Sequence, residues 1–185
     1  MNNKKIVIGI AGEIASGKET VAEYLVEKHR AKKFRMSDIL KNILERVNLG
    51  NNRKNLGKLS LALRESFGQD VLIHALIEDI KGSDADIVII DGIRRMAELE
   101  HLSNLDNFKF IYLKADLKKR YERLIRRGEK QDDNIKTFEE FKKDHQIETE
   151  TTILELEDKA GTVITNDETL EDLYKKIDSA LNEFA

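Results

Sequence analysis

The sequence predicts an α/β fold of three layers, in which helices cover both faces of a parallel β-sheet. Short runs of β-branched and other apolar residues alternate with longer segments whose apolar residues recur at helical spacing. Two of the runs, residues 4–11 and 87–90, are mainly continuous apolar stretches, which is typical of strands buried on both faces. With 185 residues, 40% of them hydrophobic, the chain suits one domain over residues 1–185 with a sizeable core.

The individual elements follow from local patterns along the chain. Strands are predicted at residues 4–11, 33–36, 87–92, 108–113 and 162–165. Helices are predicted at residues 17–30, from an N-cap at Ser37 and Asp38 onward, at 59–80 with a break at Gly68, and at 94–105, 116–127, 138–158 and 167–184. The Gly- and Asn-rich segment 48–57 is predicted as a loop. We expect segments 37–80 and 128–150 to be insertions over the carboxyl ends of the strands.

The junction between the first strand and the first helix carries a phosphate-binding pattern. Gly12 and the pair Gly17-Lys18 have the spacing G-x-x-x-x-G-K in a strand–loop–helix context. Glycines let backbone N–H groups approach a phosphate chain, the helix N-terminus adds its dipole, and the lysine adds a mobile positive charge. The residues expected to bind ATP at this loop are Gly12, Ala15, Ser16, Gly17, Lys18, Glu19 and Thr20.

The position after the lysine departs from the commonest form of this loop. Many such loops place Ser or Thr there to bind Mg²⁺, whereas here Glu19 follows Lys18 and the hydroxyl comes at Thr20. Glu19 either points away from the phosphates or approaches the metal, and the sequence does not decide. We expect Thr20 and backbone amides to hold the phosphates of ATP, and Mg²⁺ to be carried mainly by water and by Asp91.

An acid and two arginines follow the second strongly apolar strand. Asp91 ends this strand, which is the usual place for the acid that orients hydrated Mg²⁺, although a cap or turn role is the alternative. Arg94 and Arg95 come next. An arginine beside a phosphate loop can clamp a second anionic group bidentately, and the alternative is a solvated first turn of a helix.

Arginines are also concentrated in the predicted helix 116–127. Arg120, Arg123 and Arg127 share a face at helical spacing, and the helix runs into a polar stretch that begins at Gly128. Arginines brought in by a closing loop stabilise the charge spread over a transferred phosphoryl group. The alternative is the solvated face of a charged helix. Farther on, residues 132–133 are both Asp and either hold that loop or are simply solvated.

The composition disfavours several classes of protein. There is no cysteine, which excludes disulfides and thiolate metal sites, and the four histidines lack metal-ligand spacing. The net charge is −3 although 36% of residues are charged, so no global positive field points to nucleic acid as a partner. No apolar stretch approaches the length of a membrane span. We expect a cytoplasmic monomer or homodimer with no membrane partner.

Taken together, the motifs resemble the nucleoside monophosphate kinases, such as adenylate kinase. GEIASGKET at 12–20 is similar to their G-x-x-x-x-G-K-x-T loop, and MSDILK at 36–41 to the segment that opens their monophosphate-binding helices. VIIDGIRR at 88–95 is similar to their strand ending in Asp-Gly-Phe-Pro-Arg, and RLIRR at 123–127 to the helix leading into their lid. The resemblance spans nearly the whole chain. It is closest to a branch labelled dephospho-CoA kinase-like, adenylate kinase-related or deoxynucleoside monophosphate kinase.

The resemblance implies a P-loop NTPase fold with five parallel strands in the order 2-3-1-4-5, and a short lid at about 128–150. Implied as catalytic are Lys18, Asp91, Arg123 and Arg127, with Thr20 and Asp91 serving Mg²⁺ and Asn166 lying near the adenine of ATP. Implied for the acceptor are Asp38, Lys41, Arg94 and Arg95. The family proline before the last arginine is missing, so either Arg94 or Arg95 is the equivalent clamp, and Lys41 replaces the usual arginine.

The functional prediction is an ATP-dependent small-molecule kinase that uses Mg²⁺ and transfers the γ-phosphoryl group to a nucleoside or deoxynucleoside monophosphate. One alternative is a dephospho-CoA kinase, whose hydroxyl acceptor needs a carboxylate base, with Asp38 as the candidate. A nucleotide-binding regulatory ATPase is the second, disfavoured because its guanine-reading and transporter signature motifs are missing. A kinase of nucleic-acid ends is disfavoured because no basic groove is indicated. The acceptor's base and sugar remain open.

Overall fold

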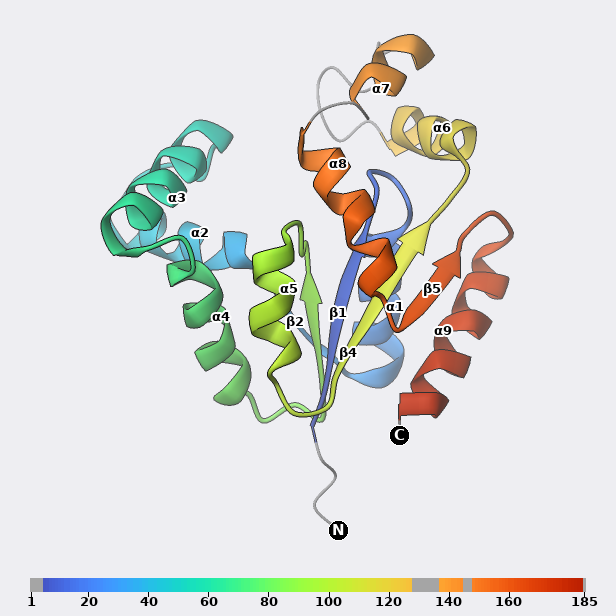
Figure 1. The fold of residues 1–185 in the computed structure, drawn as a ribbon, viewed down its shortest axis with the longest axis horizontal. Coiled ribbons are helices and arrows are strands. Elements are labelled where there is room, and N and C mark those ends of the chain that lie inside the picture. Colours follow the sequence, from blue (N-terminus) through green and yellow to red (C-terminus); the bar gives the residue numbers. More distant parts are fainter. Residues whose placement is uncertain (1–4, 128–136, 145–147, 185) are drawn as a thin grey trace.

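The computed structural model describes residues 5–127, 137–144 and 148–184. Five strands form one parallel sheet in the order β2-β3-β1-β4-β5. This order and the three-layer arrangement confirm the predicted fold (Figure 1). The strands are β1 (Ile6–Gly12), β2 (Lys32–Phe34), β3 (Ile87–Asp91), β4 (Phe108–Lys114) and β5 (Thr162–Thr165). The α-helices are α1 (Lys18–His29), α2 (Met36–Arg46), α3 (Arg53–Phe67), α4 (Val71–Lys81), α5 (Met96–Ser103), α6 (Leu117–Arg127), α7 (Phe138–Asp144), α8 (Glu148–Glu155) and α9 (Leu170–Phe184), with a 3₁₀ turn at Glu157–Lys159.

Alternating side chains of the sheet build two separate cores. Val7 and Ala11 of β1 pack into a cluster with residues of α4, α5 and α8, whereas Ile8 and Ile10 pack with residues of α1 and α9. This is the period of two that a strand imposes, because successive side chains point to opposite faces. The continuous apolar runs of β1 and β3 are therefore explained, since each face of the sheet is covered by helices.

The carboxyl ends of the strands meet at one edge of the sheet. Ile10 of β1 is paired with Asp91 of β3, and Gly12 of β1 is paired with Leu113 of β4. Helices α2 and α3 lie on one side of this edge and α6 and α7 on the other (Figure 1). The topology thus brings the phosphate-loop motif and the Asp91 motif together, although they lie far apart in the sequence.

Several predicted boundaries were wrong for local reasons. The expected loop 48–57 ends at Asn52, whose side chain accepts a hydrogen bond from the Asn55 backbone N–H at 2.9 Å and so caps α3. Helix α2 begins at Met36, with Arg35 as its N-cap, so the predicted Ser37–Asp38 cap lies in its first turn. Helix α5 begins at Met96 rather than Arg94, because Arg95 is extended, with φ −132° and ψ 145°.

The long helices predicted at 59–80 and 138–158 are both divided. The break at Gly68 is confirmed, since this glycine has φ 102° between α3 and α4. The second segment forms α7, α8 and a 3₁₀ turn rather than one helix. Ile153 and Leu156 from this region are buried against the sheet, so its second half belongs to the core.

The arm, defined here as α2 and α3, is anchored to this core through α2, which buries Leu40 and Leu44 and packs Met36 and Ile39 against the core cluster. Helix α3 contains no buried residue, whereas α4 buries Leu72, Ile73, Leu76 and Ile80 against the sheet. The predicted insertion 37–80 therefore combines an outer helix, α3, with two helices, α2 and α4, that contribute buried side chains. In the described part of the chain, no helix has both the length and the apolar character needed to cross a membrane.

Candidate functional site

The phosphate loop has a backbone that glycine alone can adopt at two positions. Gly12 has φ +146° and Gly17 has φ +107°. A Cβ atom at Gly12 would lie 2.1 Å from the Leu113 carbonyl oxygen, and one at Gly17 would lie 2.4 Å from Asn166 Nδ2. Both positions therefore combine a left-handed φ with no room for a side chain. The loop wraps closely around the start of α1 for this reason.

Polar groups are gathered inside this loop. The Lys18 ammonium donates to the carbonyl oxygens of Gly12 and Glu13, at 2.6 and 2.7 Å. Ser16 is fully buried, and its Oγ has no hydrogen-bond partner among the described residues. Helix α1 begins at Lys18, so its N-terminal dipole is directed at the loop. Two glycines that lack a Cβ atom, a buried hydroxyl without a partner and a lysine at a helix N-terminus suit a phosphate chain.

Asn166 supports the loop from the end of β5. Its side chain is buried and its Nδ2 donates to the Ser16 carbonyl oxygen at 2.8 Å, while its backbone N–H donates to the Lys114 carbonyl oxygen at 2.8 Å. The Asn166 side chain thus contacts the phosphate loop directly. The prediction that it lies near adenine remains a prediction.

The two described arginines of the predicted α6 cluster have different surroundings. Arg120 is buried; its Nη2 lies 2.8 Å from Glu13 Oε1 and its Nε donates to the Ala115 carbonyl oxygen at 3.0 Å. Arg123 is half-buried and donates from Nη2 to the Asn166 carbonyl oxygen at 2.8 Å. Arg120 therefore holds the phosphate loop in place, whereas Arg123 reaches the same region through Asn166.

One nitrogen of the Arg123 guanidinium, Nη1, is available for a further hydrogen bond. Its Nη1 is buried and has no hydrogen-bond partner in the residues described. A guanidinium with one end anchored on a carbonyl and the other unpaired is suited to an incoming anion. The side chain of Arg127 and the acids of residues 132–133 lie outside the described residues, so their predicted roles stay predictions.

A charged network joins α1, β2 and β3 beside the loop. Arg35 contacts Asp91 Oδ2 through Nε at 2.7 Å and through Nη2 at 2.5 Å. The same guanidinium pairs with Glu19, whose other oxygen lies 2.8 Å from Lys33 Nζ. Glu19 is thus turned toward the β2 and β3 ends and belongs to the same cluster as Asp91. Both roles considered for Glu19 stay predictions.

The network shifts two pKa values. Burial alone would raise the pKa of Glu19, but the Lys33 hydrogen bond and the Arg35 charge outweigh it and lower this pKa. Burial alone would lower the pKa of Arg35, but the Asp91 and Glu19 carboxylates raise it. Glu19 and Arg35 therefore keep their charges at neutral pH.

The predicted acceptor residues fall into two groups at the base of the arm. Asp38 Oδ1 accepts from Lys41 Nζ at 2.6 Å within the first turns of α2. Arg94 and Arg95 lie in the extended link after β3, and the backbone N–H of Arg94 donates to Glu98 Oε2 at 3.0 Å. The structure thus places all four residues around the same strand ends, in the α2 and β3–α5 segments.

Sequence reasoning missed Arg35 and Arg64. Arg64 of α3 lies 3.7 Å from the buried carboxylate of Glu98, and its side chain is 13% exposed. Burial first, and then the positive charge of Arg95, lower the pKa of Arg64. The Arg64–Glu98 pair therefore joins α3 of the arm to α5, the helix that follows the β3–α5 link. No local pattern reveals this, because the contact depends on how the arm packs.

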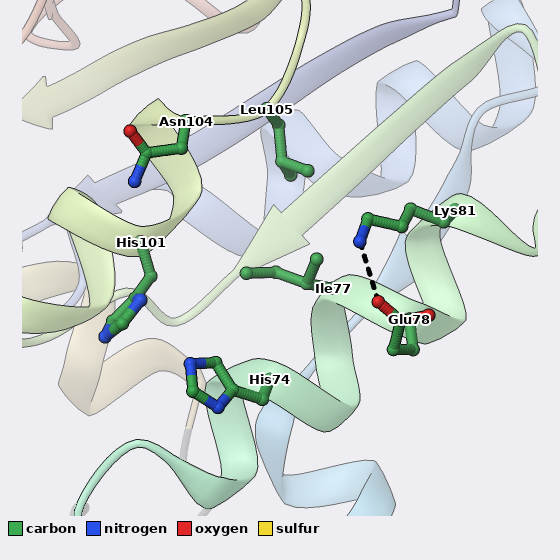
Figure 2. A pocket seen from close by; sticks show the side chains of 7 residues that line it. All are labelled: His74, Ile77, Glu78, Lys81, His101, Asn104 and Leu105. Atoms are coloured by element: carbon green, nitrogen blue, oxygen red, sulfur yellow. Dashed lines mark hydrogen bonds and ion pairs between the residues drawn. The ribbon is translucent and has the colours of Figure 1, made fainter.

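A hollow of about 330 Å³ lies between α4 and α5. Figure 2 shows the side chains that line it, among them His74 and His101. The rings of His74 and His101 meet edge to face with centroids 4.9 Å apart, and His101 Nε2 lies 3.2 Å from Asp70 Oδ2.

Among the described residues, no group of three or more His, Cys, Asp or Glu could hold a metal ion. A Mg²⁺ ion at the loop would therefore depend on water and phosphate oxygens besides Asp91 and Thr20.

Comparison with known proteins places the chain in a family. A sequence profile described as an AAA domain matches residues 11–142, which is more than half of the chain. The UPF0200 protein of Sulfurisphaera tokodaii is 31% identical over 175 residues, covering 95% of each chain. The chain belongs to the AAA-domain family and to the UPF0200 family.

Other UPF0200 relatives match over different shares of their length. The UPF0200/UPF0201 protein of Archaeoglobus fulgidus is 31% identical over 97% of this chain, which spans only 56% of that relative. The UPF0200 protein of Methanocaldococcus jannaschii is 27% identical, with 96% of this chain and 90% of that protein covered.

Solved structures share the fold. TT1252 from Thermus thermophilus aligns with a TM-score of 0.65 at 22% identity, over 98% of this chain and 99% of that one. Shikimate kinase from Bacteroides thetaiotaomicron aligns with a TM-score of 0.58 at 17% identity, over 96% and 95%. This UPF0200 chain thus has a P-loop kinase-like fold.

Proposed function

We propose that the protein is an ATP-dependent kinase that phosphorylates a nucleoside or deoxynucleoside monophosphate. One observation carries the proposal: cationic groups for two separate anions are gathered at one sheet edge. Lys18 and the loop would serve the donor phosphates, and Arg94 and Arg95 in the extended link after β3, with Arg64 of α3 beside Glu98, would serve a second anion next to the arm. A simple ATPase has no need for the second site.

In the proposed reaction, the bond between the γ-phosphorus and the β,γ-bridging oxygen breaks and a bond forms to an oxygen of the acceptor phosphate. Lys18, the loop N–H groups and Ser16 would hold the donor, and Arg123, anchored on the Asn166 carbonyl with Nη1 unpartnered, would stabilise the charge that develops on the transferred group. Bound Mg²⁺ would neutralise donor oxygens, with Asp91 and Thr20 as its protein-side oxygens. Because a phosphate acceptor is already ionised, positioning and charge stabilisation carry the rate without a general base.

A hydroxyl acceptor, as in dephospho-CoA, is the second candidate. Asp38 is the candidate base for it, because this carboxylate lies in the first turn of α2, just after the end of β2, where Lys41 Nζ contacts it at 2.6 Å. Such an acceptor must lose a proton, which a carboxylate could accept. Asp38→Ala separates the two: severe loss of turnover with ATP binding intact would indicate a hydroxyl acceptor.

The test is an assay of ADP release over ribo- and deoxyribonucleoside monophosphates and dephospho-CoA, with the phosphorylated product identified. We expect one class of monophosphate to be phosphorylated, and Lys18→Ala to lower turnover by roughly 100- to 1,000-fold. Slow ATP hydrolysis without any phosphorylated acceptor would contradict the proposal and support the regulatory ATPase.

A further inference from the structure

We propose that Arg35 is a positioning residue of this site, which holds the Asp91 carboxylate in the orientation needed to accept a water of the ATP-bound Mg²⁺. The inference rests on the proposed use of ATP and Mg²⁺, and it concerns a residue to which no motif assigns a role. Arg35 lies between β2, which ends at Phe34, and α2, the first helix of the arm, which begins at Met36.

The contact between Arg35 and Asp91 is set by the sheet. Strand β2 is paired with β3 so that Phe34 lies opposite Ile90, and the next residues along are Arg35 and Asp91. Arg35 is extended, with φ −139° and ψ 139°, and continues the strand direction. The pair is therefore placed by the backbone register, unlike a surface ion pair between two flexible side chains.

The geometry leaves one carboxylate oxygen available. Both Arg35 nitrogens contact Oδ2 of Asp91, at 2.7 and 2.5 Å. For Oδ1 of Asp91, no hydrogen bond or ion pair is found within the described residues. The planar guanidinium fixes the rotation of the carboxylate, whose side chain is only 10% exposed. Outer hydrogen bonds of this kind commonly orient the groups that serve a metal.

Charge balance gives Arg35 a second task. Asp91 and Glu19 would repel each other as two carboxylates at the same site. Arg35 contacts both, and Lys33 contacts Glu19 at 2.8 Å. Lys33 therefore offers a matched control. It carries the same charge as Arg35, lies on β2 just before Arg35 and also contacts Glu19, but in the described contacts it does not touch Asp91.

The test measures ATP binding by titration calorimetry on the whole chain, with Mg²⁺ and with a chelator. The ratio of the two affinities is the contribution of Mg²⁺. We expect Arg35→Ala to reduce this ratio by roughly 10- to 100-fold, with little change in metal-free affinity. Lys33→Ala should leave the ratio near that of the wild type, and Arg35→Lys should restore part of it by keeping the charge and one hydrogen bond.

A double-mutant cycle with Asp91→Asn identifies the route of the effect. If Arg35 acts through Asp91, adding Arg35→Ala to Asp91→Asn causes no further loss. Additive losses, an unchanged ratio in Arg35→Ala, or an equal loss in Lys33→Ala would each overturn the proposal. A larger ratio in Arg35→Ala would also overturn it, because Arg35 would then compete with the metal.

Misfolding and failure of the proposed function are both distinguishable from failure of this inference. A thermal melt checks each variant, and Arg35→Gln and Arg35→Lys carry the test if the alanine variant does not fold. The readout is binding, so an ATP-binding protein that phosphorylates no acceptor still gives the Mg²⁺ ratio. Absence of ATP binding in the wild type would overturn both proposals, whereas ATP binding without an acceptor would overturn only the first.

Discussion

The phosphate loop and the arm lie at the same edge of the sheet, but they differ in how many of their contacts are buried. Two buried side chains contact the phosphate loop: Arg120 pairs with the Glu13 carboxylate, and Asn166 donates to the Ser16 carbonyl oxygen. The arm has an outer helix with no buried residue, and Leu61 and Phe67 of α3 are 59% and 72% exposed. The phosphate loop is thus anchored by buried polar contacts, whereas the outer helix of the arm buries none of its side chains.

The largest expected effect is at the support of the loop. Arg120→Ala should lower the free energy of unfolding by about 3–5 kcal/mol, because it removes one partner of a buried ion pair and leaves the Glu13 carboxylate without Arg120. Arg126→Ala, an exposed position on the same helix, should change stability by less than about 0.5 kcal/mol. Chemical denaturation measures both. Equal effects would show that the loop is not held through Arg120.

Apolar truncations compare the core with the arm directly. Leu25→Ala removes a fully buried side chain between α1 and the sheet and should cost about 2–5 kcal/mol. Leu61→Ala on α3 should cost less than about 0.5 kcal/mol, since its side chain is largely exposed. Denaturant unfolding of the two variants tests this. A cost at Leu61 close to that at Leu25 would mean that a packing partner covers the arm.

Arg64 tests whether the arm serves the acceptor alone. Arg64→Ala should raise the KM for the acceptor substrate roughly tenfold, as expected for the loss of a hydrogen bond to a charged group. The affinity for ATP should stay unchanged. Arg53→Ala, at an exposed position of the same helix, is the control. Steady-state kinetics with each substrate varied would show the separation. A shift of the same size in the affinity for ATP would show that Arg64 does not act on the acceptor alone.

The smallest expected effect concerns Glu19 and pH. Its pKa is lowered below the ordinary 4.5, so its pairing stabilises the fold above that pH and is lost as pH falls through the lowered value. Because the side chain is 42% exposed, the contribution should stay below about 1 kcal/mol. Stability should therefore fall less between neutral pH and acid for Glu19→Gln than for wild type. An unchanged acid profile would show that the pairing contributes nothing measurable.

Much of the donor side could be predicted from the sequence alone. The G-x-x-x-x-G-K spacing, the apolar run before it and the helical pattern after it are local signals, and Gly12 and Gly17 are required by the local backbone. The apolar run ending at Asp91 likewise predicts a buried strand whose end reaches the same edge. These predictions succeed because short-range pattern and strand topology determine them.

Only the tertiary structure shows what surrounds those residues. Arg35 contacts Asp91 because β2 pairs with β3, and Arg64 contacts Glu98 because of the way the arm packs. The partners are far apart in the sequence, so helical or strand periodicity does not reveal these contacts. The α6 arginines looked alike as a helical face, yet burial under the loop makes Arg120 a support and leaves Arg123 with an unpaired nitrogen. The sequence alone therefore determined the sheet and the phosphate loop, because their signals are periodic and local. Which charges neutralise one another depends on distance in space, and folding alone decides that.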